Sequence, residues 1–155
     1  MDSPVTSPEQ IARLRVAYDR CFGCGVRNPV GLQLSDFTAS PDGARAPFLT
    51  RSDHSGFHGV VHGGVIATAL DEISAWACVL SEGVFVFTAK LDIRYRKEVR
   101  TGATYTLIGR VVERRGKRLR VESKLCSGDT ALAESSGLFV VADTVEAVLT
   151  SPDAD

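Results

Sequence analysis

The sequence predicts an α+β fold in which a long apolar helix is enclosed by a curved antiparallel β-sheet. The first observation is the stretch 65–80, which is apolar on nearly every side and must therefore be covered over most of its surface. The second is a change of periodicity after this stretch, from 3.6 to 2 residues, in several successive runs. One antiparallel sheet that curls around the helix is the simplest way to bury it.

Length and composition set limits on this fold and on its partners. The 155 residues are 44% hydrophobic and predict a single domain over 1–155, with 1–20 as an N-terminal helical segment and 144–155 as a tail. The 18 Lys and Arg residues nearly balance the 19 Asp and Glu residues, which argues against disordered, collagen-like and highly basic proteins. A net charge of −1 offers no general attraction to nucleic acid or to an acidic membrane, so neither is expected as a partner.

The cellular compartment is expected to be the cytoplasm. Residues 1–4 (MDSP) lack the basic and apolar regions of a signal peptide. The apolar stretch 65–80 contains Asp71 and Glu72 and is shorter than the roughly 20 apolar residues of a membrane span. It is therefore predicted to be a buried helix. In the cytoplasm the cysteines are expected to be reduced, without disulfide bonds.

Capping and turn signals predict the elements before the long helix. Ser7, Pro8 and Gln10 form a capping-box start for a short helix. Three residues at helical spacing are expected to bury one face of it: Ile11, Leu14 and Tyr18. A structured loop, two short strands with a turn between them, and a Gly/His-rich loop follow at 21–31, 32–37, 44–50 (turn 41–43) and 53–64.

Alternating patterns predict the elements after the long helix, which is expected to end at Gly83. Four strands are expected at 89–96, 105–112, 118–125 and 132–141, with turns at 114–117 and 127–129. The tail after Asp143 is expected to be a short helix or a frayed end.

The start of the long helix offers hydrogen-bond donors. Gly63 and Gly64 stand where the helix begins, so their N–H groups lack intrahelical acceptors and lie at the positive end of the helix dipole. Such donors suit the carbonyl oxygen of an ester or thioester under attack. Paired glycines also allow a ligand to approach the backbone closely.

An acidic pair lies within the long helix. Asp71 has apolar neighbours, so its carboxylate needs a polar companion, such as Thr68 or Ser74, or a water-bearing cleft. A carboxylate in such a place suits a general base or nucleophile. The alternative is that Asp71 and Glu72 simply solvate an exposed stripe of the helix.

The segment 62–72 (HGGVIATALDE) resembles the signature of hotdog-fold acyl-CoA thioesterases of the phenylacetyl-CoA and hydroxybenzoyl-CoA thioesterase type. The loop 21–32 (CFGCGVRNPVGL) is similar to a bacterial subgroup of that superfamily, and the strand 88–95 fits the same order. The resemblance covers roughly residues 20–142. It implies a long central helix wrapped by a curved antiparallel sheet, in a homodimer whose two active sites lie at the subunit interface.

The resemblance also implies roles for individual residues. Asp71 is the general base or nucleophile that delivers water to the thioester carbon. The Gly63 N–H holds the thioester oxygen, with Gly64 assisting, and His62 shapes or polarises the site. Thr88 lies where relatives carry a hydroxyl that positions the water.

One departure from the family pattern concerns the loop before the helix. Many relatives have an Asn six residues before the histidine of the HGG motif, whereas this chain has Gly56. Either His58 supplies the polar group as a substrate-binding residue, or the loop is shifted. Glu72 is a further substrate-binding candidate, although it points about 100° around the helix from Asp71.

The cysteines are expected to pack rather than to bind metal. Cys78 lies in the apolar helix, and Cys21 and Cys24 lie in the structured loop. A structural zinc site needs four ligands, and no second paired motif follows, so neither a metal nor a cofactor is expected. Three residues elsewhere in the chain are candidates to complete such a site from a distance: His54, His58 and Cys126, the last of which is otherwise expected to pack in a strand-like run.

A basic segment lies at 110–120, where six of the eleven residues are Lys or Arg. One interpretation is a solvated hairpin edge protected by its charge. The other is that Arg115 and Arg118 bind the phosphates of coenzyme A. Nucleic acid is a third option, but no aromatic residues alternate with these charges.

The sequence therefore favours a cytoplasmic acyl-CoA thioesterase that needs no cofactor and forms a homo-oligomer, either a dimer or a dimer of dimers. Two alternatives stay open. One is a non-catalytic hotdog module that binds acyl-CoA, and the other is a hotdog hydratase or dehydratase acting on enoyl thioesters. The acyl group is not specified by any of these patterns.

Overall fold

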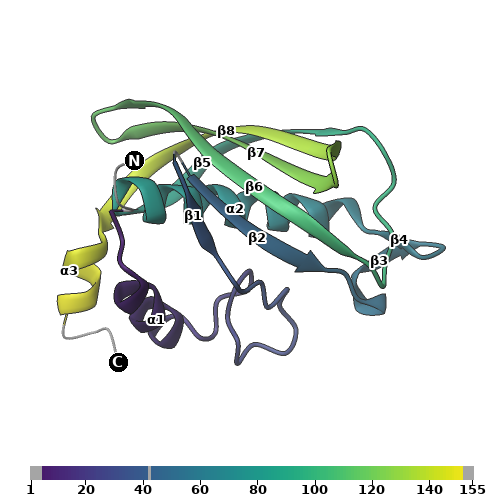
Figure 1. Cartoon of the computed structure of the whole chain (residues 1–155), viewed down its shortest axis with the longest axis horizontal. Helices are drawn as coiled ribbons and strands as arrows, with labels where there is room; N and C mark the ends of the chain where they lie inside the picture. Colours follow the sequence, from purple (N-terminus) through teal and green to yellow (C-terminus); the bar gives the residue numbers. More distant parts are fainter. Residues whose placement is uncertain (1–4, 42, 152–155) are drawn as a thin grey trace.

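The computed structural model describes residues 5–41 and 43–151. A six-stranded antiparallel sheet curves over the long helix α2 (Gly63–Glu82), in the strand order β1-β2-β6-β7-β8-β5 (Figure 1). Its strands are β1 (Thr38–Ser40), β2 (Gly43–Leu49), β5 (Val84–Tyr95), β6 (Thr104–Arg115), β7 (Arg118–Ser127) and β8 (Thr130–Thr144). The predicted α+β class, with a central helix wrapped by a curved antiparallel sheet, is confirmed.

The remaining elements lie around this unit. Helix α1 (Pro8–Ala17) and the loop after it cover the side of α2 that faces away from the sheet (Figure 1). A 3-10 turn, η1 (Ser52–His54), and a small hairpin of β3 (Ser55–Phe57) and β4 (Val60–Val61) lead into α2. The short helix α3 (Val145–Thr150) follows β8, where the sequence allowed either a short helix or a frayed end.

Helix α2 is enclosed over most of its length, as its composition predicts. Its side chains Leu70, Ile73 and Leu80 are fully buried against the sheet and α1. The helix starts two residues before the expected position 65, and it ends at Gly83, whose φ of 65° closes it in a left-handed conformation. By length and composition alone this helix could cross a membrane, but the same apolar surface is what the sheet covers here.

The N-terminal segment confirms one local prediction and corrects two others. Ser7 and Gln10 form the expected capping box of α1. Within α1 only Leu14 is buried, and Tyr18 is exposed. The predicted strand at 32–37 is wrong, because this segment is irregular and β1 begins only after it.

A tertiary contact explains that irregular segment. Gln33 and Asp36 have positive φ angles of 53° and 56°, which a strand does not accommodate. The Arg51 guanidinium donates to the carbonyl of Gly31 and to the side chain of Gln33, and so holds the chain in this shape. The predicted turn at 41–43 joins β1 to β2, although its residue 42 lies outside the described residues.

The long strands follow the alternation of the sequence. Along β7, Leu119, Val121, Ser123 and Leu125 are buried toward α2, while the residues between them are exposed. Strand β5 starts five residues before the predicted position 89, and both predicted turns between β6, β7 and β8 are present. Strand β5 lies at one edge of the sheet, where one side of its backbone has no partner strand within the described chain.

Candidate active site

An aspartate–threonine contact joins α2 to the edge strand β5. The Thr88 hydroxyl donates to Asp71 Oδ1 over 2.7 Å, beside a register shift in the pairing of β5 with β8. Asp71 is half-buried and Thr88 is exposed. The helical companions expected for Asp71 do not serve it, since Thr68 and Ser74 donate to main-chain carbonyls one turn earlier in α2. The partner of the carboxylate comes from the neighbouring strand instead.

The start of α2 carries the predicted donors, but they are not equivalent. His62 is the N-cap, and its Nδ1 accepts the N–H of Gly64 over 2.9 Å. The Gly64 N–H is therefore engaged by His62 in this structure, and its assistance at an oxyanion site stays a prediction. The Gly63 N–H has no acceptor within residues 5–41 and 43–151, and the Gly63 carbonyl accepts from the Tyr95 hydroxyl over 2.8 Å.

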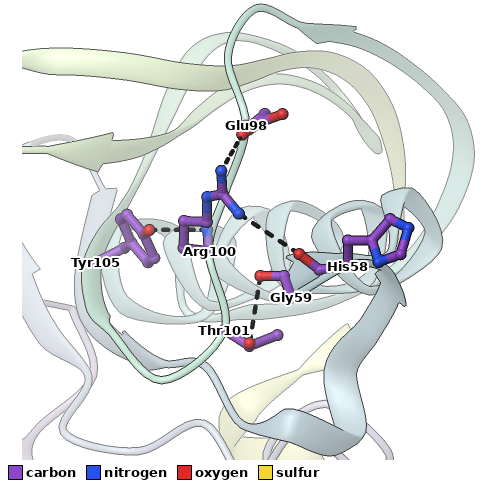
Figure 2. Close-up of polar contacts among 6 residues, drawn as sticks. All are labelled: His58, Gly59, Glu98, Arg100, Thr101 and Tyr105. Atoms are coloured by element: carbon purple, nitrogen blue, oxygen red, sulfur yellow. Dashed lines mark hydrogen bonds and ion pairs between the residues drawn. The ribbon is translucent and has the colours of Figure 1, made fainter.

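The hairpin β3–β4 fixes the approach to the start of α2. Figure 2 shows Arg100 bridging the Glu98 carboxylate, at 2.9 Å, and the His58 carbonyl, at 3.5 Å. The Thr101 hydroxyl donates to the carbonyl of Gly59 over 3.3 Å, which ties the same turn to the β5–β6 connection (Figure 2). These contacts hold the turn through its backbone.

His58 and Gly56 differ from their expected roles at this hairpin. The His58 imidazole is exposed, points away from Arg100 and packs edge-on against Phe57 (Figure 2). A Cβ at Gly56 would lie 3.1 Å from His62 Cα, so this position faces the histidine but leaves little room for a side chain. His58 meets the rest of the chain mainly through its backbone carbonyl rather than as a polar group beside Asp71.

Glu72 points away from Asp71 into a second environment beneath the loop 21–31. Its Oε1 accepts from the Trp76 indole N–H over 3.2 Å and lies 3.7 Å from Cys21 Sγ. Burial raises the pKa of Glu72 to about 7, with the Cys21 thiolate adding to the effect. A cavity of about 380 Å³ opens beside it, with walls that include Trp76 and Phe85.

The two loop cysteines are paired in space, and both thiols are free. The Cys24 thiol and two backbone N–H groups hold the pKa of Cys21 well below its usual value, at about 5. The pKa of Cys24 is raised by the hydrogen bond to Cys21 and by burial. Glu72 joins these sulfur atoms, whereas none of the three residues considered from the sequence (His54, His58, Cys126) belongs to this group. Cys78 and Cys126 are buried, as expected for packing residues.

Arg115 and Arg118 of the basic hairpin lie on the face of the sheet away from α2, whereas Arg114 pairs with Glu82 of α2 at 2.9 Å. Arg115 and Arg118 are directly paired across the β6–β7 turn. Side chains alternate along β7, and Leu119 faces α2, so its neighbour Arg118 and the paired Arg115 point away from α2. Arg115 is exposed and pairs with Glu113 at 2.7 Å. Within one chain, therefore, these two arginines are not brought to the Asp71 site.

Sequence reasoning missed Tyr95 and Trp76. The alternation of β5 places Tyr95 on one face of the strand, but nothing local identifies Gly63 as its partner. Trp76 lies one turn after Glu72, so its spacing indicates the contact, although its apolar surroundings favoured a core or interface role.

Comparison with known proteins shows similarity to thioesterases. Residues 58–134 match the model of the thioesterase superfamily. The acyl-coenzyme A thioesterase THEM4 of Rattus norvegicus is 36% identical over 90 residues, which are 57% of this chain and 38% of that protein. This chain thus spans less than half the length of the curated relative.

Solved structures share the fold. The thioesterase superfamily protein RHA08564 superposes with a TM-score of 0.71 and 22% identity, over 89% of this chain and 69% of that one. The smu.793 protein of Streptococcus mutans UA159, solved bound to acetyl CoA, gives a TM-score of 0.64 and 22% identity over 70% and 89%. The fold is the hotdog fold, and residues 58–134 of the chain match the thioesterase superfamily.

Proposed function

We propose that this protein hydrolyses an acyl-CoA, or a related acyl thioester, to the free acid and the thiol. The observation that carries the proposal is the contact between Asp71 on α2 and Thr88 on β5. The first N–H of the same helix α2, at Gly63, has no acceptor in the described chain. A rat relative named acyl-coenzyme A thioesterase and a structural neighbour solved with acetyl CoA support this substrate class.

The proposed chemistry needs only side chains and backbone of the protein. In one route Asp71 takes a proton from a water molecule as that water attacks the thioester carbon; the C–S bond then breaks, and the proton passes to the departing thiolate to give the thiol. In the other, Asp71 attacks the carbon itself and expels the thiolate, and water hydrolyses the resulting anhydride to the free acid. The Thr88 hydroxyl, held by Asp71, orients the carboxylate and the water. The Gly63 N–H, at the positive end of α2, stabilises the negative charge that develops on the thioester oxygen.

The spacing of these groups favours a site built from two chains. Gly63 and Asp71 are eight residues apart on one helix, which corresponds to about 12 Å along its axis. An attacking group and an oxyanion donor must each lie about 3 Å from one carbonyl group. That requirement is hard to meet within one copy, so we propose that Asp71 of one chain acts with Gly63 of its partner.

The edge strand β5 offers the surface for such a dimer. Thr88 lies toward the Asp71 end of β5, and Tyr95 lies toward the Gly63 end. If two copies pair their β5 edges antiparallel about a twofold axis, the Asp71 end of one faces the Gly63 end of the other. The exposed Phe87 lies on the same strand and would become covered.

Thiol release from a panel of acyl-CoAs tests the proposed reaction. We expect release with the wild-type chain and a loss of at least about 100-fold with Asp71→Asn, because the variant keeps the size but not the basicity of the side chain. Asp129→Asn in the exposed β7–β8 turn is the matched control and should keep full activity. Binding without release would support a binding module instead, and loss of enoyl absorbance would support a hydratase.

Mixing two inactive variants tests the two-chain site. Asp71→Asn chains combined with Gly63→Pro chains form heterodimers in which one site carries both defects and the other carries none. Random exchange should therefore restore about a quarter of wild-type activity. No recovery, with exchange verified by mass spectrometry, would place both groups of a site in one chain.

The cytoplasmic location expected from the sequence stays a prediction.

A further inference from the structure

A second cluster of reactive side chains lies outside the proposed thioester site. Cys21 and Cys24 of the loop after α1 converge with Glu72 of α2. We propose that these three residues bind one zinc ion, with the fourth coordination position open to the adjacent cavity. This inference goes beyond the proposed function and does not depend on it.

The distances within the cluster suit a tetrahedral metal. The two Sγ atoms and a carboxylate oxygen of Glu72 all lie within 4.8 Å of one another. Cys21 Sγ and Glu72 Oε1 are 3.7 Å apart. In a tetrahedral site with Zn–S near 2.3 Å and Zn–O near 2.1 Å, this edge measures roughly 3.6 Å. The ligands therefore need little movement to close around an ion.

The loop is folded around the Cys21 sulfur. The backbone N–H groups of Gly23 and Cys24 donate to this sulfur, so the turn fixes the position of one proposed ligand atom. The carbonyl groups of this turn form hydrogen bonds with other segments. The Phe22 carbonyl accepts from the N–H of Leu32 over 2.9 Å, and the Gly23 carbonyl accepts from the N–H of Leu34 over 3.0 Å. The Arg15 guanidinium takes the Cys24 carbonyl over 2.7 Å. The turn is thus held in place by the protein, whether or not an ion is bound.

The carboxylate of Glu72 has no basic partner in the part of the chain that the structure describes. Within residues 5–41 and 43–151, no Lys or Arg side chain forms an ion pair with Glu72, and its side-chain partners are Cys21, Cys24 and Trp76. A carboxylate held away from water is costly unless a cation or strong donors compensate. A divalent ion at the point where the three ligands meet would supply that charge.

Two neighbouring residues support the ligand carboxylate. The Trp76 indole N–H donates to Oε1 of Glu72 and fixes its orientation, as the residues around metal ligands commonly do. Position 23 is occupied by glycine because a Cβ there would lie 2.4 Å from Glu72 Oε2. The loop backbone therefore packs directly on the carboxylate.

The chemistry of the ligands selects the ion. Two sulfur ligands favour zinc over calcium or magnesium, which prefer oxygen. Three protein ligands with an open position are typical of a site that admits water or another ligand. That position would face the cavity of about 380 Å³, whose walls include all three ligands. A carboxylate from α2, rather than a second cysteine pair, completes the set.

Metal analysis of the full chain, purified without an affinity tag or a chelator and then dialysed against zinc-free buffer, tests the site. We expect about one zinc per chain and four free thiols after the metal is removed in denaturant. Cobalt added to metal-free protein should give the visible bands of a tetrahedral site and a thiolate-to-cobalt charge-transfer band. Less than about 0.1 zinc per chain after incubation with zinc sulfate would overturn the proposal.

Variants locate the ion. Cys21→Ser and Cys24→Ser should each weaken zinc binding at least tenfold in competition with a chromophoric chelator, and Glu72→Gln should weaken it less. Cys126→Ser, at a buried thiol in β7, is the matched control and should bind zinc like the wild type. Equal zinc binding by every variant would refute the assignment. A purified chain that is lighter by two hydrogens before any metal is removed, with the disulfide mapped to Cys21 and Cys24 by peptide mass analysis, would also overturn it.

If a cysteine variant fails to fold, the wild-type cobalt spectrum decides. Its charge-transfer intensity reports the number of bound thiolates, and two are expected. A spectrum without thiolate bands would exclude ligation by Cys21 and Cys24, whatever the fate of the variants.

Discussion

Replacing Gly63 by proline removes one hydrogen-bond donor and almost nothing else. Gly63 is the first residue of α2, the position at which proline is best tolerated in a helix. The preceding His62 has φ −59° and ψ 136°, the extended conformation that a residue before proline requires. The Gly63 carbonyl, which accepts from Tyr95, is kept. We therefore expect Gly63→Pro to fold with its α2 helix intact.

The magnitude follows from the role proposed for this N–H. Removing one donor from an oxyanion site typically lowers kcat by about 100- to 1000-fold, or about 2.7–4 kcal/mol of transition-state stabilisation. Because His62 already occupies the Gly64 N–H, no second donor at this helix start is free to replace the first. We expect the loss to fall near the upper end of this range and to appear in kcat rather than in KM.

Gly63→Ala is the matched control, since it keeps the N–H. An added Cβ would meet the Tyr95 ring at 3.6 Å, which is ordinary van der Waals contact. We expect its rate to stay within about threefold of wild type. Both variants are compared by thiol release from the best acyl-CoA of the panel and by circular dichroism. If the proline and alanine variants hydrolyse equally fast, the Gly63 N–H is not the oxyanion donor.

Three further predictions concern other parts of the chain. Thr88→Val should lower kcat by about 10- to 100-fold through loss of the hydrogen bond to Asp71, whereas Thr88→Ser should keep most of the rate; equal rates for the two would deny the hydroxyl a role. Phe87→Lys on the β5 edge should shift the chain from dimer to monomer in analytical ultracentrifugation and abolish activity with it, and an active monomer would contradict the two-chain site. Burial lowers the pKa of His54, whose Nδ1 accepts a backbone N–H and whose Nε2 has no partner among residues 5–41 and 43–151, so the folded state favours the neutral ring. This contribution to stability is present above about pH 6.5 and is lost as the pH falls, so urea midpoints between pH 7.5 and 5.5 should decline more steeply for wild type than for His54→Gln; parallel declines would refute it.

Local patterns predicted the parts of the fold that local interactions determine. The capping box at Ser7, the stop at Gly83 and the alternation of β7 are each encoded within a few residues, and all are present. The segment 32–37 shows the opposite case, because an Arg51 guanidinium from further along the chain imposes its irregular path. Strand propensity could not report that contact.

The candidate sites show the same difference between local and long-range interactions. The helix start and Asp71 are close in sequence, so their spacing could be recognised before the fold was known. Cys21 and Glu72 are 51 residues apart, and a search for paired cysteine motifs does not find a carboxylate ligand. The donor to Asp71 was sought one turn away on α2, but it comes from β5 because the sheet brings that strand against the helix.

The middle and the C-terminal half of α2 are buried, which makes the helix rigid. Its side chains Leu70, Ile73 and Leu80 are fully buried in the core, so each chain holds its own Gly63 and Asp71 in fixed positions, and in the proposed dimer it presents both to its partner in that fixed arrangement. Catalytic spacing is then the same for every acyl group. In the proposed site, selection among acyl groups therefore falls to surfaces that can vary without moving this helix, such as the β3–β4 turn. Substrate preference could be re-engineered at those surfaces while the reacting groups stay in register.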